Sequence, residues 1–93
     1  MKDEPKNVFK NGLNIIQGNK HWYKDDRMHR EDGPAYIGAD GFKTWSIHGK
    51  LHRLDGPAVI TKESTRWCYE GKWIKEVSSQ EEFEQWLKYK SFL

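Results

Sequence analysis

Apolar and polar residues alternate with a period of two through the middle of the chain. Trp45 and Ile47 fall on one face of such a segment, and Ser46 and His48 fall on the other. This period is typical of β-strands, in which successive side chains point to opposite faces. Segments containing glycine, such as Gly49-Lys50 and residues 38–41, separate the alternating stretches and predict turns. The central part of the chain therefore predicts short antiparallel strands.

A β-hairpin unit occurs twice along this part of the chain. Trp22 recurs as Trp45, and Ala35 recurs as Ala58, at the same offset of 23 residues. The shared signature is a Trp followed by His-Arg-x-Asp-Gly-Pro-Ala. A third copy begins at Trp67, after 22 residues, and lacks the His-Arg signature. Repetition of one supersecondary unit predicts that neighbouring units extend one sheet.

The last part of the chain changes to a helical period. Phe83, Trp86, Leu87 and Lys90 recur at helical spacing and predict an apolar stripe that packs on the sheet. Ser79 and Glu82 fit a capping box at the start of this helix.

We therefore expect one mostly β domain over residues 1–93. It comprises an N-terminal segment (1–17), hairpin repeats (18–76) that form an antiparallel β-meander of five to seven short strands, and one C-terminal helix (78–90). Trp45 and Trp67 are expected to be largely buried on one sheet face, with Trp22 alongside them.

Composition narrows the class of protein. The net charge is +2, from 16 basic and 14 acidic residues, which is too weak for a strongly basic nucleic-acid binder. Cys68 is the only cysteine, so an intramolecular disulfide and a thiolate metal cluster are both excluded. No stretch is apolar enough to predict a signal peptide or a membrane span. These features predict a cytoplasmic protein that makes no membrane contact.

The tandem units Trp-x-x-x-Gly-x-x-His-Arg-x-Asp-Gly-Pro-Ala resemble a variant of the MORN-like repeat. The matching residues run from Gly18 to Gly71, and the Ser79-x-x-Glu82-Phe83 segment is similar to the usual ending of such arrays. The chain departs from the pattern in the first unit, where Asp25-Asp26-Arg27 stands in place of the usual glycine. The resemblance implies a β-meander, and it implies an origin in bacteriophages or large viruses.

The repeated His-Arg-x-Asp sets contain groups that hydrolases and nucleases use. A His-Asp pair can act as a general base, and an Arg can stabilise an oxyanion. However, a catalytic site is needed only once, and both units carry the same set. An Asp in an Asp-Gly turn can instead accept backbone N–H bonds and pair with a neighbouring Arg. We therefore expect a structural turn role for six residues: His29, Asp32, Gly33, His52, Asp55 and Gly56.

On this basis the chain is expected to have no catalytic residue, no metal site and no cofactor. A small His/Asp hydrolase or nuclease stays an alternative. The histidines lack the ligand spacing of structural zinc sites, because His48 and His52 straddle a predicted turn.

The function that the sequence favours is binding to another protein. Trp, Tyr and Arg are the residues that anchor protein interfaces. Alternation places Tyr23, Tyr36 and His48 opposite the tryptophans. We expect six partner-binding residues: Tyr23, Arg30, Tyr36, His48, Arg53 and Trp73.

Given the resemblance, the concrete hypothesis is a phage-encoded inhibitor in the host cytoplasm, which docks on a host protein and blocks a defence system such as CRISPR. Nucleic-acid binding is the alternative, because lysines such as Lys20 and Lys43 lie beside the tryptophans. Acidic residues such as Asp25 and Glu63 are mixed among those lysines and would repel phosphate.

Overall fold

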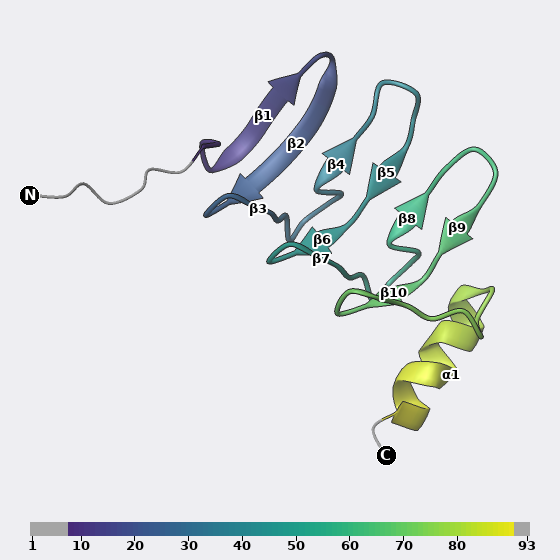
Figure 1. The fold of residues 1–93 in the computed structure, drawn as a ribbon. Helices are drawn as coiled ribbons and strands as arrows, with labels where there is room; N and C mark the ends of the chain where they lie inside the picture. The colour runs from purple at the N-terminus through teal and green to yellow at the C-terminus, as the bar shows by residue number, and fades with distance from the viewer. Residues whose placement is uncertain (1–7, 91–93) are drawn as a thin grey trace, which may run out of the picture.

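The computed structural model describes residues 8–90 (Figure 1). Residues 1–7 and 91–93, which include part of the expected N-terminal segment, lie outside the described residues. The elements are β1 (Gly12–Ile16), β2 (Asn19–Lys24), β3 (Arg27–Met28), β4 (Tyr36–Ile37), β5 (Lys43–Thr44), β6 (Ser46–Ile47), β7 (Lys50–Leu51), β8 (Val59–Ile60), β9 (Thr65–Arg66), β10 (Cys68–Tyr69), β11 (Lys72–Trp73) and α1 (Gln80–Lys90). The predicted antiparallel, mostly β fold with one C-terminal helix is confirmed.

The strands divide between one large sheet and two small hairpins. The large sheet has the order β1-β2-β4-β5-β8-β9, with β3 also paired to β2. The pairs β6–β7 and β10–β11 form separate two-stranded sheets. This division gives eleven short strands in residues 8–90, against the five to seven expected.

The division has a simple origin in the repeat. In each unit the strand that leads into the turn contains a tryptophan. In the second and third units this strand is interrupted at the tryptophan. Trp45 lies between β5 and β6, and Trp67 lies between β9 and β10. One half of the strand pairs in the large sheet, and the other half pairs with the strand that returns from the turn.

Two-residue turns with positive φ angles close the hairpins at one edge. His48 and Gly49 have φ angles of 49° and 82°, so the turn is centred there rather than on the expected Gly49-Lys50, and Lys50 begins β7. In the first unit, Asp26 takes the place of this glycine with a φ of 63°. Its carboxylate accepts the backbone N–H groups of Val8 and Phe9, both at 2.8 Å. These two bonds give the aspartate a role that glycine could not fill.

The molecule is flat, with extents of 51 × 34 × 19 Å and a radius of gyration of 15.4 Å. A compact domain of this length would have a radius of gyration of about 12 Å. Figure 1 shows the hairpins side by side in one layer, with α1 at the C-terminal end. The buried apolar cluster therefore lies at that end, and comprises Trp67, Ile74, Val77 and Phe83.

The tryptophans differ in burial along the array. Trp67 is buried, with 7% of its surface exposed, as expected. Trp22 and Trp45 are partly buried, which agrees with the expected burial of Trp45, although both are more exposed than Trp67. The reason is that helix α1 covers only the last unit, whereas Trp45 borders an open groove.

The helix begins at Gln80, two residues later than predicted. The Ser79 hydroxyl accepts the N–H of Glu82, as a capping serine does. The Glu82 carboxylate accepts the N–H of Ser78 rather than that of Ser79, so the capping box is displaced by one residue. The predicted stripe packs inward through Phe83, Trp86 and Leu87, and the Lys90 ammonium lies 4.5 Å from the Tyr69 ring centroid.

Candidate functional site

Each complete unit holds its arginine in a clasp against its tryptophan. The first clasp comprises Trp22, Arg30, Asp32, Gly33 and Pro34. The Arg30 guanidinium carbon lies 3.9 Å from the centroid of the Trp22 ring. Arg30 Nε donates to Asp32 Oδ1 at 3.1 Å, and Nη1 donates to the carbonyl oxygen of Pro34 at 3.2 Å. The loop between β3 and β4 is therefore folded back on its own strand.

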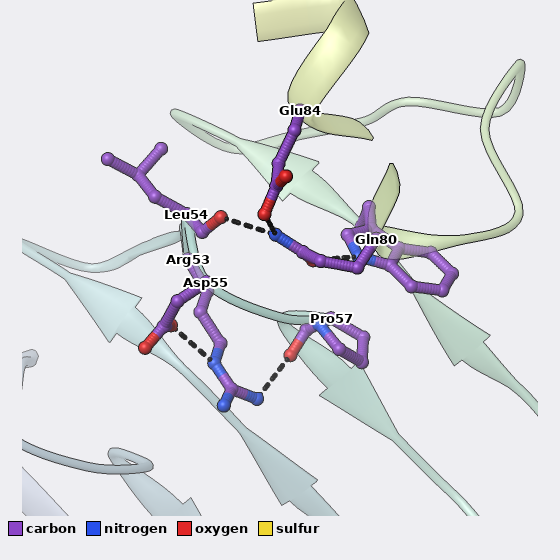
Figure 2. A network of polar contacts seen from close by, with 7 residues as sticks. Arg53, Leu54, Asp55, Pro57, Gln80 and Glu84 are labelled. Atoms are coloured by element: carbon purple, nitrogen blue, oxygen red, sulfur yellow. Dashed lines mark hydrogen bonds and ion pairs between the residues drawn. The ribbon is translucent and has the colours of Figure 1, made fainter. Parts of the chain in front are cut away.

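The second clasp repeats this geometry with Trp45, Arg53, Asp55, Gly56 and Pro57. The Arg53 guanidinium carbon lies 3.8 Å from the Trp45 centroid, and both hydrogen bonds are 3.0 Å long. Figure 2 shows the guanidinium between the Asp55 carboxylate and the Pro57 carbonyl. An identical arrangement in both units identifies the clasp as a property of the repeat.

The glycine of each clasp is required by the packing of the arginine. A Cβ added at Gly33 would lie 2.9 Å from Arg30 Cζ, and one at Gly56 would lie 2.6 Å from Arg53 Cζ. Real Cβ atoms do not approach other atoms so closely, so any side chain here would displace the guanidinium. The Asp-Gly pair of the signature is therefore explained by the arginine that precedes it.

The histidines of the signature connect successive units. His29 Nδ1 accepts the N–H of His48 at 2.8 Å, and His52 Nδ1 accepts the N–H of Glu70 at 2.9 Å. Both donors stand in the positive-φ turns of the following unit. His29 Nε2 contacts Glu31 at 3.2 Å, so both of its ring nitrogens have partners. Asp32 pairs with Arg30 and not with His29, so the first set does not assemble a His-Asp dyad.

The third unit replaces the His-Arg signature with contacts to the helix. Ile74 stands at the position of the histidines and belongs to the buried cluster. Gln80 Oε1 accepts the indole N–H of Trp67 at 2.8 Å, and Gln80 Nε2 donates to the Leu54 carbonyl and to Glu84 (Figure 2). Gln80 thus joins the second clasp loop to the third unit and to α1. Periodicity gave no signal for this residue, because Trp67 and Leu54 are distant from it in sequence.

A row of aromatic rings crosses the N-terminal part of the large sheet. The Phe9 and Tyr23 rings stack at 4.1 Å, and His21 lies 6.0 Å from Tyr23. His21 then contacts Tyr36 edge-on at 4.9 Å, and Tyr36 contacts Phe42 at 5.8 Å. We call these five residues the aromatic row. Within residues 8–90 no second layer covers them, and Phe42 at the end of the row is exposed.

The aromatic row and the clasps occupy opposite faces of the sheet. His21 pairs with Tyr36 across β2 and β4, so these two rings share a face, and Trp22 points to the other face. The same register places Lys20 and Lys43 on the Trp face, beside Ile37 and Ile60. Within the strands of the large sheet, Arg66 is the only charged residue on the aromatic face. The aromatic face is therefore nearly free of charge.

The structure separates the six residues expected to bind a partner. Tyr23 and Tyr36 belong to the aromatic row, whereas Arg30 and Arg53 lie within the clasps, where their polar contacts are intramolecular. His48 is exposed in a hairpin turn. Trp73 is 45% exposed, with the Arg66 guanidinium 4.3 Å from its ring centroid. Phe9, His21 and Phe42 complete the row, and alternation within the strands offered a signal for His21.

An open groove of about 430 Å³ lies between the two clasps. Its lining includes Asp32 from the first clasp loop, and Trp45, Ile47 and Leu54 from the second unit. The two guanidinium groups at its walls are paired within the clasps. The groove therefore offers a ligand mainly exposed carboxylates and the side chain of Leu54.

The remaining groups with possible chemistry are the Cys68 thiol and the dispersed His, Asp and Glu side chains. Burial raises the pKa of the Cys68 thiol, and Arg66 opposes this shift. Within residues 8–90, no cluster of His, Cys, Asp or Glu side chains has the arrangement of a metal site. In the same range, no helix is long and apolar enough to cross a membrane.

One prediction concerns the histidines. His29→Phe is expected to lower the free energy of unfolding by about 1–3 kcal/mol, because the N–H of His48 loses its acceptor beside a buried ring. The matched control is His21→Phe, since no partner for the buried His21 Nδ1 is found in the described residues. This second change is expected to leave stability unchanged or to raise it. Urea unfolding of both variants, followed by circular dichroism, tests the contrast, and equal losses would contradict it.

Comparisons of the chain with protein families, with curated proteins and with solved structures find no match.

Proposed function

We propose that this chain is a non-enzymatic protein-binding module that docks through the aromatic row. The observation that carries the proposal is a row of five contacting rings on an uncovered and nearly uncharged sheet face. Large aromatic side chains with little conformational freedom anchor most protein interfaces. The clasps on the opposite face hold the loops in place, so they leave the aromatic face rigid and accessible.

The distribution of charge favours a protein partner over a nucleic acid. A protein that stacks bases on aromatic rings also needs cations near the phosphates. Here Lys20 and Lys43 lie on the opposite face of the sheet from Tyr36. Asp40, in the turn next to Phe42, adds a carboxylate at the end of the row. Such a surface offers a phosphate backbone few cations to bind.

The narrower hypothesis is a phage-encoded inhibitor of a host protein, and it rests on the repeat resemblance. Site-specific photo-crosslinking tests whether the aromatic row binds a bacterial protein, which both the general and the narrower hypothesis require. A benzophenone amino acid is placed at position 42 or, as a control, at position 89, where Tyr89 is 68% exposed on α1. In a bacterial lysate, the first variant is expected to form one discrete covalent adduct with a protein. Adducts that are identical from both positions, or adducts removed by nuclease, would contradict the proposal.

Substitution of the same residue gives a quantitative prediction. Phe42→Ala is expected to weaken binding to the captured protein tenfold or more, because it removes an exposed anchor at the end of the row. The matched control is Trp73→Ala, which removes an aromatic outside the row that is 45% exposed, against 37% for Phe42. Binding is measured by calorimetry, with melting temperatures recorded for each variant. Equal loss of affinity from both changes would place the docking surface elsewhere.

A further inference from the structure

The two ends of the repeat array differ in how they are closed. At the C-terminal end, α1 packs on the third unit and buries Phe83 completely. At the N-terminal end, strand β1 pairs only with β2 in the described part of the chain (Figure 1). Repeat arrays need a closed end, because an open end exposes apolar side chains and unpaired backbone groups. Strand β1 is such an open end.

The hydrogen-bonding groups of this edge can be assigned residue by residue. Trp22 donates its N–H to Ala35 and accepts the N–H of His29, so both of its backbone groups point away from β1. Its partner Leu13 is therefore in a non-hydrogen-bonded pair, and its N–H and C=O point away from β2. Alternation gives Ile15 the same orientation. The outer edge thus presents two donors and two acceptors, spaced as in an antiparallel ladder.

The side chains along this edge are unusual for an exposed strand. The sequence of β1 is Gly-Leu-Asn-Ile-Ile, without a charged residue. Ile15 is 65% exposed, and Leu13 and Ile16 are also exposed. Exposed edge strands normally carry charges or proline that prevent pairing with other chains. This strand carries neither, whereas the opposite edge, β9, has only two residues and includes Arg66.

We propose that β1 pairs with β1 of a second copy of this chain, in antiparallel orientation about a two-fold axis at Asn14. In this register Leu13 lies opposite Ile15 of the second copy, and Ile15 lies opposite Leu13, so four apolar side chains meet on one face. Lys10 lies opposite Gly18, so no like charges face each other. Registers centred on Leu13 or on Ile15 would instead oppose these apolar side chains with Asn11 or Gln17. The strand is therefore complementary to itself in this one register.

Pairing of a single edge buries little surface, so the dimer is expected to be weak and reversible. Sedimentation velocity of the full chain should show a shift from monomer to dimer as the concentration rises. Ile15→Pro should abolish this shift, because it removes an N–H that points outward and leaves the bonds between β1 and β2 intact. Unchanged circular dichroism would show that the variant remains folded.

Cysteine crosslinking tests the register. Asn14→Cys places two thiols opposite each other on the axis, at a separation that a disulfide can span. Mild oxidation should convert this variant to a covalent dimer. Leu13→Cys is the matched control, because its copies lie diagonally across the axis and too far apart. The wild-type chain should remain monomeric on the same gel, since Cys68 is only 1% exposed.

Two results would overturn the proposal. One is a monomer at every concentration together with no covalent dimer of Asn14→Cys. The other is equal crosslinking of Leu13→Cys, which would indicate random collision. A dimer that forms only after residues 1–7 are deleted would also overturn it, because the edge would then be occupied by the chain itself. None of these measurements involves the aromatic row, so the proposed function is tested separately.

Discussion

Phe83→Ala is expected to lower the free energy of unfolding by about 3–5 kcal/mol, a large fraction of the stability of a small domain. Phe83 is fully buried and packs with Trp67, Ile74 and Val77 in the main apolar cluster of the molecule. Its ring also stacks on Trp86 at 5.9 Å. Within residues 8–90 only α1 packs over the flat repeat array, so truncation here leaves a cavity that no other element can fill.

The measurement is urea unfolding at equilibrium, followed by circular dichroism. The matched control is Tyr89→Ala on the same helix, where the side chain is exposed and the expected change is below about 0.5 kcal/mol. If Phe83→Ala were as mild as this control, α1 would not be the closing element of the array. The buried cluster would then have to lie elsewhere.

Trp45→Ala is expected to lower the free energy of unfolding by about 3 kcal/mol. The indole lies at the bend between β5 and β6, and the Arg53 guanidinium stacks on it. The backbone N–H of Trp45 donates to Ala58 and its carbonyl accepts the N–H of His52, so the residue lies where both halves of the unit join. Removal of the indole leaves the Arg53 guanidinium without the ring on which it stacks. Because Trp45 is only partly buried, the expected loss of stability is smaller than that for Phe83→Ala.

Trp73→Ala provides the comparison, since Trp73 also lies beside a guanidinium and is 45% exposed. It is expected to cost less than about 1 kcal/mol, the range of an exposed cation–π contact. Thermal unfolding of both variants measures the difference. Equal costs would show that the tryptophans of the complete units have no special structural role.

Much of the fold could be predicted from the sequence, because the repeat and the helix are each marked by residues that lie close together in the chain. The offset of 23 residues between Trp22 and Trp45, and the helical spacing of Phe83 and Trp86, depend only on neighbouring residues. The division of the strands among one large and two small sheets could not be predicted. It depends on a bend at each tryptophan, which alternation of apolar and polar residues does not reveal.

The candidate site was predicted in part. Alternation placed Tyr23 and Tyr36 on the face opposite the tryptophans, and their register agrees with this. Arg30 and Arg53 were expected to bind a partner, but the guanidinium of Arg53 stacks on Trp45 and bonds to Pro57. The contact between Arg53 and Trp45 joins residues eight positions apart through a folded loop, so it becomes visible only in the three-dimensional structure. The contribution of Phe9 depends on the Asp26 carboxylate, which accepts the N–H groups of Val8 and Phe9 and so holds these two residues near Tyr23.

The central claim is that the Arg-x-Asp-Gly-Pro part of the signature forms a structural clasp with the tryptophan of its unit, and a double-mutant cycle between Gly56 and Arg53 tests it most directly. Gly56→Ala alone is expected to destabilise the protein by about 1–2 kcal/mol, because its Cβ displaces the guanidinium from Trp45 and costs the bonds to Asp55 and Pro57. In the Arg53→Ala background the same change should be neutral or stabilising by up to about 1 kcal/mol, since the methyl group then meets no guanidinium and restricts the unfolded chain. A coupling free energy above about 1 kcal/mol is the result that the clasp predicts. Additive effects of the two substitutions would contradict it.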